Sequence, residues 1–272
     1  MFCFIETEEI MFFKPHDQSF SKLETSNYSL VLPAISVGNV GQLTVDVLIA
    51  TTQAEKVGSI YDESLLPVIG NDPFSEADTA LSCQLSTCCD VYSVKSKQFM
   101  IIQQRASFVK GKRKLFRKKL LEWIKNQQFK VVYLIGSMYA HMRTDQQLTG
   151  LQFRYVATDE AKSLVPTFSK WIELEDTADE FGRSEKRFPG SGIFKTLYGD
   201  CIEEKIAFVG LLMFCAEGDN SLDAVKMADH VNAWTNVVEE HDKSEVLGLQ
   251  SKWQVPKSWN LNYGSTFNHH IY

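Results

Sequence analysis

Two nearly continuous apolar runs constrain the fold of this chain more than any other feature. Lys130–Gly136 reads Lys-Val-Val-Tyr-Leu-Ile-Gly, and Ile206–Phe214 is a second run of the same kind. Strands that are buried on both faces have this pattern, whereas strands with one face in water alternate apolar and polar residues. Both runs therefore predict strands at the centre of a sheet that helices cover on its two sides.

Further segments alternate between strand and helix patterns along the chain. Apolar runs predict strands over residues 29–35, 57–61, 91–94, 98–105 and 153–157, of which the third and fourth form a hairpin. Helical spacing of apolar residues predicts helices over residues 43–52, 112–128, 190–203 and 219–238. This alternation predicts an α/β fold class: a single three-layer domain with a largely buried central sheet flanked by helices.

The same patterns divide the chain into three parts. Residues 1–27 are polar and without period, which predicts an irregular N-terminal arm, and residues 28–240 form the α/β domain. Within the domain, the acidic and turn-rich residues 173–186 are expected to form a mobile insertion. Residues 241–272 turn polar and form an extended C-terminal tail.

Composition excludes several classes of protein. The 272 residues carry 28 Lys and Arg against 34 Asp and Glu, a net charge of −6, which argues against a dedicated nucleic-acid binder. No stretch reaches the roughly 20 apolar residues of a membrane span, and no basic segment opens a signal peptide. The 6 cysteines include no C-x-x-C pair, so we expect free thiols without a chemical role. Such cysteines are typical of a reducing compartment, and the expected location is the cytoplasm and nucleus.

Motifs for catalysis are incomplete. Gly190-Ser-Gly-Ile-Phe-Lys-Thr196 has Phe194 where a phosphate loop needs its second glycine, so it is better explained as a glycine-rich turn before a helix. A hydrolase would use Ser137 and His141, with Asp145 to orient the histidine, yet the pattern G-x-S-x-G is missing. We therefore expect no catalytic, cofactor-binding or metal-binding residues, and keep a phosphorylase-like hydrolase that uses Ser137 and His141 as the alternative.

A basic segment is the first candidate for binding. Eight cations fall among the 15 residues from Arg105 to Lys119. The plainest interpretation is a solvated helix face, and the second is a surface that docks an acidic protein, because a local positive field speeds association with a negative partner. The residues proposed for acidic-partner docking are Lys112, Arg113, Lys114, Arg117 and Lys118. A third interpretation, RNA binding by Lys112–Lys119, predicts an affinity that falls steeply with salt.

The C-terminal tail is the second candidate. Trp253, Trp259 and Tyr263 are isolated aromatic residues in a polar segment, and for the two tryptophans we favour packing on the chain's own core. The chain ends with Ile271 and Tyr272, for which docking is favoured. An aromatic side chain buries a large area, and a terminal carboxylate can be bound by a lysine or by backbone N–H groups.

Several blocks in chain order resemble a known family. They are Pro33–Leu43, Leu66–Asn71 with Pro73, Gln147–Leu148 before Phe153–Tyr155, Pro189–Tyr198, Glu217–Asn220 and Lys252–Trp259. Over about residues 30–264 the chain resembles the proteasome assembly chaperone family. The resemblance implies an α/β fold similar to that of nucleoside phosphorylases, without their active site.

The resemblance also implies a function and partners. Members are non-catalytic chaperones that need no cofactor, and the expected partners are proteasome assembly chaperone 1, in a heterodimer, and the proteasome α-subunits. The heterodimer promotes assembly of the α-ring of the 20S core particle, and family tails insert between α-subunits with a hydrophobic residue, a tyrosine and any final residue. Here Ile271 and Tyr272 supply the first two positions and nothing follows, which puts the usual docking of the carboxylate in doubt.

Overall fold

A mixed sheet forms the centre of the molecule. The computed structural model describes residues 12–16, 25–74, 85–165, 171–178, 184–239, 244–246 and 249–259. In these residues nine strands pair in the order β1-β3-β6-β7-β2-β8-β13-β9-β10. Their bounds are β1 (Phe13–Pro15), β2 (Ser29–Pro33), β3 (Glu55–Ile60), β6 (Cys89–Val94), β7 (Phe99–Gln104), β8 (Val131–Tyr139), β9 (Phe153–Ala157), β10 (Ile172–Glu173) and β13 (Phe208–Cys215).

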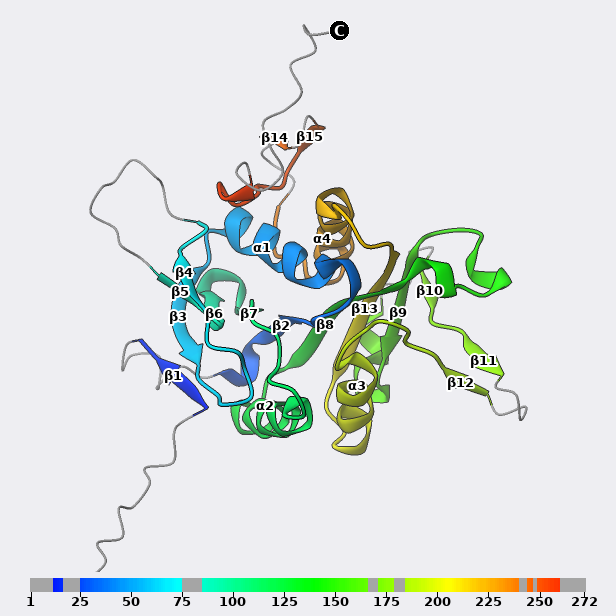
Figure 1. Ribbon diagram of the computed structural model, residues 1–272, viewed down its shortest axis with the longest axis horizontal. Helices are drawn as coiled ribbons and strands as arrows, with labels where there is room; N and C mark the ends of the chain where they lie inside the picture. The colour runs from blue at the N-terminus through cyan, green and yellow to red at the C-terminus, as the bar shows by residue number, and fades with distance from the viewer. Residues whose placement is uncertain are drawn as a thin grey trace, which may run out of the picture.

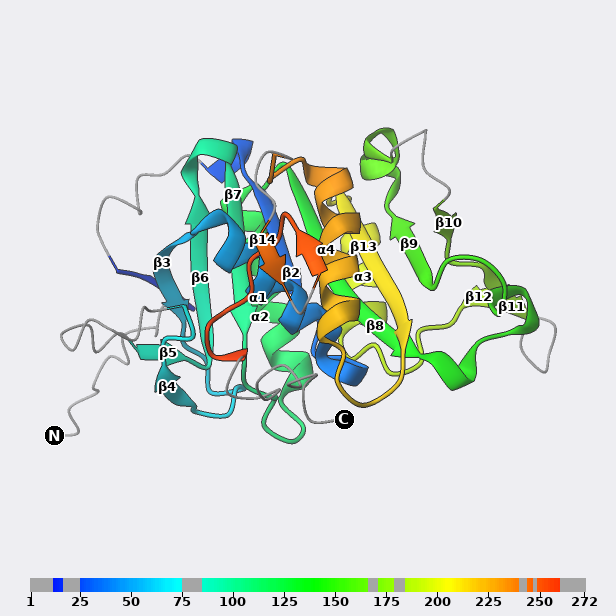
Figure 2. The ribbon, with the colours of Figure 1, turned by 90° about the horizontal axis from the view of Figure 1, so that it is seen from above.

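Helices cover both faces of this sheet. They are α1 (Val40–Thr52), α2 (Arg113–Gln127), α3 (Phe194–Glu203) and α4 (Ser221–Thr235). Helices α1 and α4 lie on one face, and α2 and α3 lie on the other (Figure 1). Figure 2 looks onto the first of these layers, in which α1 and α4 cross in front of the strands. The three-layer α/β domain expected from the apolar runs is thereby confirmed.

The alternation of side chains along β8 shows why its sequence is apolar throughout. Val132 and Leu134 belong to the core that contains Phe116 of α2, whereas Tyr133 belongs to the core that contains Met227 of α4. Strand β13, parallel to β8, alternates in the same way. Each face of these strands is buried under a different pair of helices, so neither face has positions that polar residues could occupy at low cost.

The strands at the centre of the sheet pair in parallel, and an antiparallel pair lies on either side of them. β2 is parallel to both β7 and β8, and β8 is parallel to β13. β6 is antiparallel to β7, and β9 is antiparallel to β13. The carboxyl ends of β2, β7, β8 and β13 therefore lie at one edge of the sheet, where ligand sites of open α/β sheets are usually found.

In the described part of the chain, three small hairpins lie outside the sheet. They are β4 (Ile69–Asn71) with β5 (Leu85–Thr87), β11 (Asp176–Ala178) with β12 (Ser184–Lys186), and β14 (Ser244–Val246) with β15 (Leu249–Ser251). Strands β10, β11 and β12 fall in or next to residues 173–186, where the sequence predicts a mobile insertion. A search of the described helices finds none whose length and hydropathy would suit a membrane crossing.

Among the boundaries that differ from the sequence prediction, two have a direct structural reason. The irregular arm expected over residues 1–27 is wrong for Phe13–Pro15, which pairs antiparallel with Gly58–Ile60 of β3. The helix expected from Gly190 begins at Phe194, because Gly190 and Gly192 have φ values of 79° and 66° and form the preceding turn.

Candidate interaction surfaces

Ser137 and His141 do not form a catalytic pair. Ser137 is buried, and its hydroxyl lies 2.8 Å from Ser36 Oγ and donates to the carbonyl oxygen of Val37. His141 is exposed, and its ring centre lies 5.0 Å from that of Tyr139. Among the hydrogen bonds of the described residues, none joins Ser137 to His141. This geometry is that of a structural serine, because a nucleophile needs a base within hydrogen-bond reach.

The edge formed by the carboxyl ends of the parallel strands is filled by the chain itself. A Cβ on Gly192 would overlap the carbonyl oxygen of Ile35, so the Gly190–Gly192 turn packs against the loop after β2. Cys215 Sγ lies 3.4 Å from the Val37 oxygen, and burial raises the pKa of this thiol. The glycines therefore form a tight turn before the helix, as the sequence favours, and the thiol is held in its unreactive protonated form.

A buried ion pair adjoins this edge, and sequence reasoning does not find it. Arg105, just after β7, donates from Nη2 to Asp46 Oδ1 of α1 at 2.7 Å, and Gln103 donates to the same oxygen at 2.6 Å. Gln42, Asp46 and Arg105 line a cavity of about 220 Å³ beside Trp259. Arg105 therefore holds α1 on the sheet and does not belong to an exposed basic surface.

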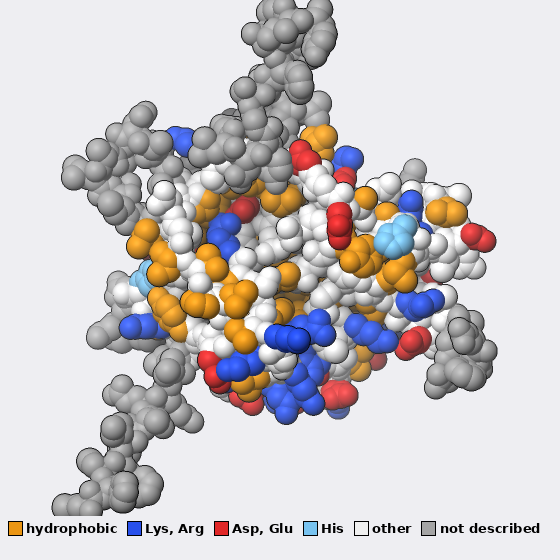
Figure 3. Space-filling model, viewed as in Figure 1, with side chains coloured by type: hydrophobic (Ala, Val, Ile, Leu, Met, Phe, Trp, Pro, Cys, Tyr) orange, Lys and Arg blue, Asp and Glu red, His pale blue; other side chains and the backbone are white. Residues whose placement is uncertain are grey.

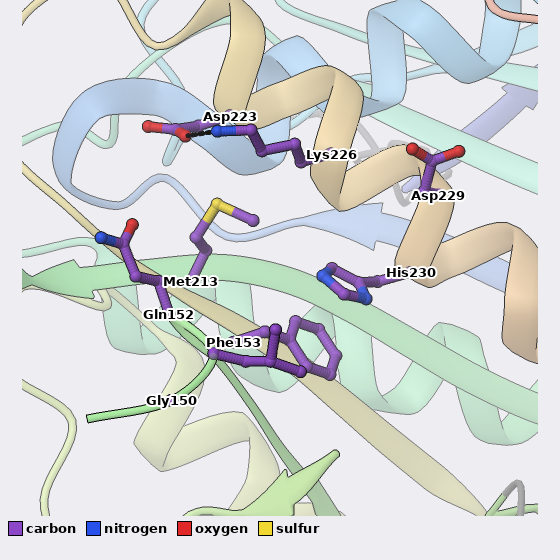
Figure 4. Close-up of a pocket in the computed structure, with 9 residues that line it drawn as sticks. Gly150, Gln152, Phe153, Met213, Asp223, Lys226, Asp229 and His230 are labelled. Atoms are coloured by element: carbon purple, nitrogen blue, oxygen red, sulfur yellow. Dashed lines mark ion pairs between the residues drawn. The ribbon is translucent and has the colours of Figure 1, made fainter. Parts of the chain in front are cut away.

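A wider cavity of about 400 Å³ lies between α4 and the start of β9. Phe153 and Met213 form its apolar floor, and the ring of His230 stacks on Phe153 with 4.0 Å between ring centres (Figure 4). Burial lowers the pKa of His230, so its ring is neutral at pH 7. Asp223 and Lys226 at its rim form an ion pair of 3.6 Å. The lining has no serine or cysteine that could act as a nucleophile.

Metal binding has no support within the part of the chain that the structure describes. There, no three His, Cys, Asp or Glu side chains are grouped as ligands of a metal ion. The smaller of the two cavities is crossed by the Arg105–Asp46 ion pair.

The basic segment divides into paired and unpaired cations. Lys112 lies 2.5 Å from Glu63, and Arg117 lies 3.0 Å from Asp200 of α3, so both serve to hold α2 in place. Arg113, Lys114 and Lys118 are exposed, and none of them forms an ion pair among the described residues. Figure 3 shows Lys and Arg side chains gathered over α2. Of the five residues proposed for acidic-partner docking, the structure leaves these three available, and their role stays a prediction.

The start of the predicted tail packs on the domain. Trp253 and Trp259 are buried in the core between the sheet, α1 and α4, as favoured from the sequence. Thr51 Oγ1 at the end of α1 accepts a hydrogen bond of 2.8 Å from the backbone of Gln254. Ile271 and Tyr272 lie outside the described residues, so their docking role stays a prediction.

Known proteins share both the sequence and the fold of this chain. The family model described as PAC2 family matches residues 30–232. A Xenopus tropicalis protein named proteasome assembly chaperone 2 is 40% identical over 247 residues, which cover 88% of this chain and 93% of the relative. The Homo sapiens protein of that name is 35% identical over 249 residues, covering 89% of this chain and 94% of the relative.

Solved structures agree at the level of the fold. Pyrococcus furiosus PbaA, described as an archaeal homolog of proteasome-assembly chaperone, has a TM-score of 0.59 at 11% identity, covering 79% of this chain and 84% of its own. Pyrococcus furiosus PbaB, described as an archaeal proteasome activator, has a TM-score of 0.57 at 13% identity. The match covers 84% of this chain and 90% of PbaB. Because the family model spans most of the domain and relatives align over nearly their whole length, this chain belongs to the PAC2 family.

Proposed function

We propose that this chain is a non-catalytic chaperone of proteasome assembly that acts as a heterodimer with proteasome assembly chaperone 1. The observation that carries the proposal is 35–40% identity to vertebrate proteins named proteasome assembly chaperone 2, over almost nine-tenths of the chain. In this proposal the heterodimer binds proteasome α-subunits and promotes formation of the α-ring of the 20S core particle, in the cytoplasm and nucleus.

The described geometry supports a role without catalysis. The serine with the strongest catalytic pattern, Ser137, is buried and bonded to backbone and to Ser36. The four described cysteines are buried, and burial raises the pKa of each thiol, so none is an activated thiolate. A protein of this kind can act without catalysis by binding to a subunit surface, because a covered surface cannot pair with an incorrect subunit.

In the proposed mechanism the C-terminal tail binds the α-ring. Trp253 and Trp259 fix the base of the tail on the α1 side of the domain. The 13 residues from 260 to 272 have an extended reach of about 45 Å, enough to contact a neighbouring subunit. Ile271 and Tyr272 are proposed to dock between α-subunits, and two tails on one heterodimer add avidity because the second insertion is intramolecular.

Co-purification from cells tests this proposal. The full-length chain, a form lacking Ile271 and Tyr272, and a control with His269→Ala and His270→Ala are isolated by one affinity tag, and bound proteins are identified by mass spectrometry. We expect chaperone 1 with all three forms and α-subunits only with the full-length chain and the control. Loss of chaperone 1 on truncation would contradict the assignment of the tail to ring binding. Recovery of neither partner by the full-length chain would refute the proposal.

A further inference from the structure

The cavity between α4 and the start of β9 has a polar group above an apolar floor. The side chains of Phe153, Met213 and His230 face one common space (Figure 4). Phe153 and Met213 are buried, so the floor of the cavity is part of the core. Leu151 lines the same cavity and is 42% exposed, which extends the apolar area to the surface. A concave apolar site with a few polar groups is the usual form of a binding site.

The imidazole of His230 is the polar group of this site. Burial lowers the pKa of His230, so at pH 7 one ring nitrogen can donate a hydrogen bond and the other can accept one. Within the described ranges, neither nitrogen has a hydrogen-bond partner. The stack on Phe153, with ring planes 21° apart, fixes the plane of the imidazole. The site therefore suits an aromatic ring that carries a hydroxyl group, which is the side chain of tyrosine.

The charged groups at the rim of the cavity are already paired. Lys226 lies 3.6 Å from Asp223. Asp229 lies 3.6 Å from Lys252 and accepts the indole N–H of Trp253 at 2.9 Å. Charged surfaces select partners of opposite sign, and here each charge has such a partner within the chain. The rim therefore favours a neutral ligand over a charged one.

The C-terminal tail starts close to this cavity. Trp259 and Leu43, which lies at the start of α1, line one small cavity. Thr44 Oγ1 donates to the carbonyl oxygen of Ala224 at 3.3 Å, so α1 and α4 are in contact, and α4 lies between α1 and β9 (Figure 1). A helix with its side chains is about 10–12 Å wide, so the path from Trp259 across both helices to the cavity is about 20–25 Å.

Reach and chemistry together select one residue of the tail. Tyr263 is four residues past Trp259 and reaches about 14 Å, which is too short. Phe267 reaches about 28 Å but carries no hydroxyl group. Tyr272 reaches about 45 Å, and the apolar Ile271 before it suits the apolar mouth of the cavity.

We propose that the α4–β9 cavity binds Tyr272 of the same chain, with the ring on the apolar floor and the hydroxyl group on His230. A group held on a short linker has an effective concentration on the order of millimolar, which favours it over the same group on a separate molecule. A docked tail is withheld from the α-ring, so the contact lowers the apparent affinity for α-subunits to the extent that tails are docked. This regulatory role rests on the proposed function, whereas the contact itself does not.

NMR of the full-length chain with isotope-labelled methionine methyl groups tests the contact. The methyl signal of Met213, assigned with Met213→Leu, moves when an aromatic ring packs on it, and Tyr272→Ala gives its position for the empty cavity. His230→Phe keeps the stacked ring and removes its nitrogens, and Leu151→Asp places a charge at the mouth. The matched control is Ile202→Asp, at a residue of α3 that is 50% exposed on the other face of the sheet. Thermal unfolding confirms that each variant is folded.

We expect the Met213 signal of the parent to differ from that of Tyr272→Ala and to stay unchanged on dilution. His230→Phe and Tyr272→Phe should each weaken docking by about fivefold, and the double variant no further, because both remove the same hydrogen bond. Leu151→Asp should weaken docking by about tenfold, with Ile202→Asp within about twofold of the parent. In pull-downs, His230→Phe and Leu151→Asp should recover more α-subunits than the parent does.

Other outcomes separate the contact from its role. An identical Met213 signal in the parent and in Tyr272→Ala would overturn the contact. A docked fraction that falls on dilution would overturn it as well, since the tail would then come from a second copy. Lower recovery of α-subunits by the two cavity variants would overturn the regulatory role, because the cavity would then belong to the ring-binding surface. A parent that shows the contact and recovers no α-subunits would refute the proposed function and leave the docking site in place.

Discussion

The indole Nε1 of Trp253 donates a hydrogen bond of 2.9 Å to Oδ1 of Asp229 on α4. The ring of Trp253 is 1% exposed and belongs to the core beneath α1 and α4. This contact makes the segment before the C-terminal tail part of the domain, so the body of the chaperone determines where the tail starts. Trp253 therefore fixes this segment of the chain on α4.

Replacing Trp253 should destabilise the whole domain. We expect Trp253→Ala to lower the free energy of unfolding by about 3–5 kcal/mol, because it leaves a large cavity in the core. Trp253→Phe keeps much of the ring and loses the hydrogen bond to the exposed Asp229, so it should cost less, about 1–2 kcal/mol. Urea unfolding followed by circular dichroism measures both values. A parent-like stability of Trp253→Ala would show that this segment is not part of the core.

The main strands could be predicted because their signal is local. The runs that contain Val132 and Phe208 are apolar at nearly every position, and a strand covered by helices on both faces needs this pattern. The apolar pattern predicts that the strand containing Val132 ends at Gly136, which is too early. The structure continues β8 to Tyr139, because the hydroxyl of Ser137 finds its partners on Ser36 and Val37, about 100 residues earlier in the chain. A local sequence pattern cannot predict a hydrogen bond between residues so far apart in the chain.

Charge could be counted from the sequence but not assigned to a surface. Four of the eight cations in the basic segment are used in ion pairs with acids far away along the chain: Arg105 with Asp46, Lys112 with Glu63, Arg117 with Asp200, and Lys119 with Asp62. The sequence pattern also does not predict strand β1, because its pairing depends on a distant part of the chain. Its three residues have no period of their own and become a strand only because β3 offers a free edge.

Asp90 should make the stability of the domain depend on pH in the acid range. Its buried carboxylate accepts hydrogen bonds from the backbone and hydroxyl of Thr87, at 2.9 and 2.6 Å, and lies 3.0 Å from Lys56 Nζ. Burial alone would raise the pKa of Asp90, but the hydrogen bonds from Thr87 and Lys56 outweigh it and hold the pKa below the ordinary 3.8. The carboxylate thus contributes stability that is complete above the unfolded pKa and is lost as the pH falls through the lower folded pKa.

Asp90→Asn should remove this dependence. We expect the variant to be less stable at pH 7 by about 1–3 kcal/mol, because the donors of Thr87 and Lys56 lose a charged acceptor. Between about pH 5 and pH 3 its free energy of unfolding should fall less steeply than that of the parent. Urea unfolding at a series of pH values gives both slopes, and parallel slopes for parent and variant would contradict the role assigned to Asp90.

Two glycines near α3 should respond in opposite ways to the same substitution. Gly192 has a φ of 66°, and a Cβ there would overlap the carbonyl oxygen of Ile35. Gly199 lies within α3, and a Cβ there meets no atom within 4 Å. Gly192→Ala should therefore destabilise the domain by more than about 1 kcal/mol, whereas Gly199→Ala should stabilise it by about 0.5–1 kcal/mol. Thermal unfolding of the pair checks the prediction, and equal shifts would contradict the packing role of Gly192.

Replacing Ser137 should lower the stability of the domain, whereas replacing His141 should not. Neither replacement should change the rate of ester hydrolysis. Ser137→Ala removes the buried hydroxyl that donates to the Val37 oxygen and bonds to Ser36 Oγ, so it should cost about 1–3 kcal/mol. His141→Ala changes an exposed side chain and should stay within about 0.5 kcal/mol of the parent. Hydrolysis of an activated ester should proceed at the same rate for parent and both variants. A shared loss of an activity present in the parent would instead restore the hydrolase hypothesis, because a nucleophile and its base fail together when either is removed.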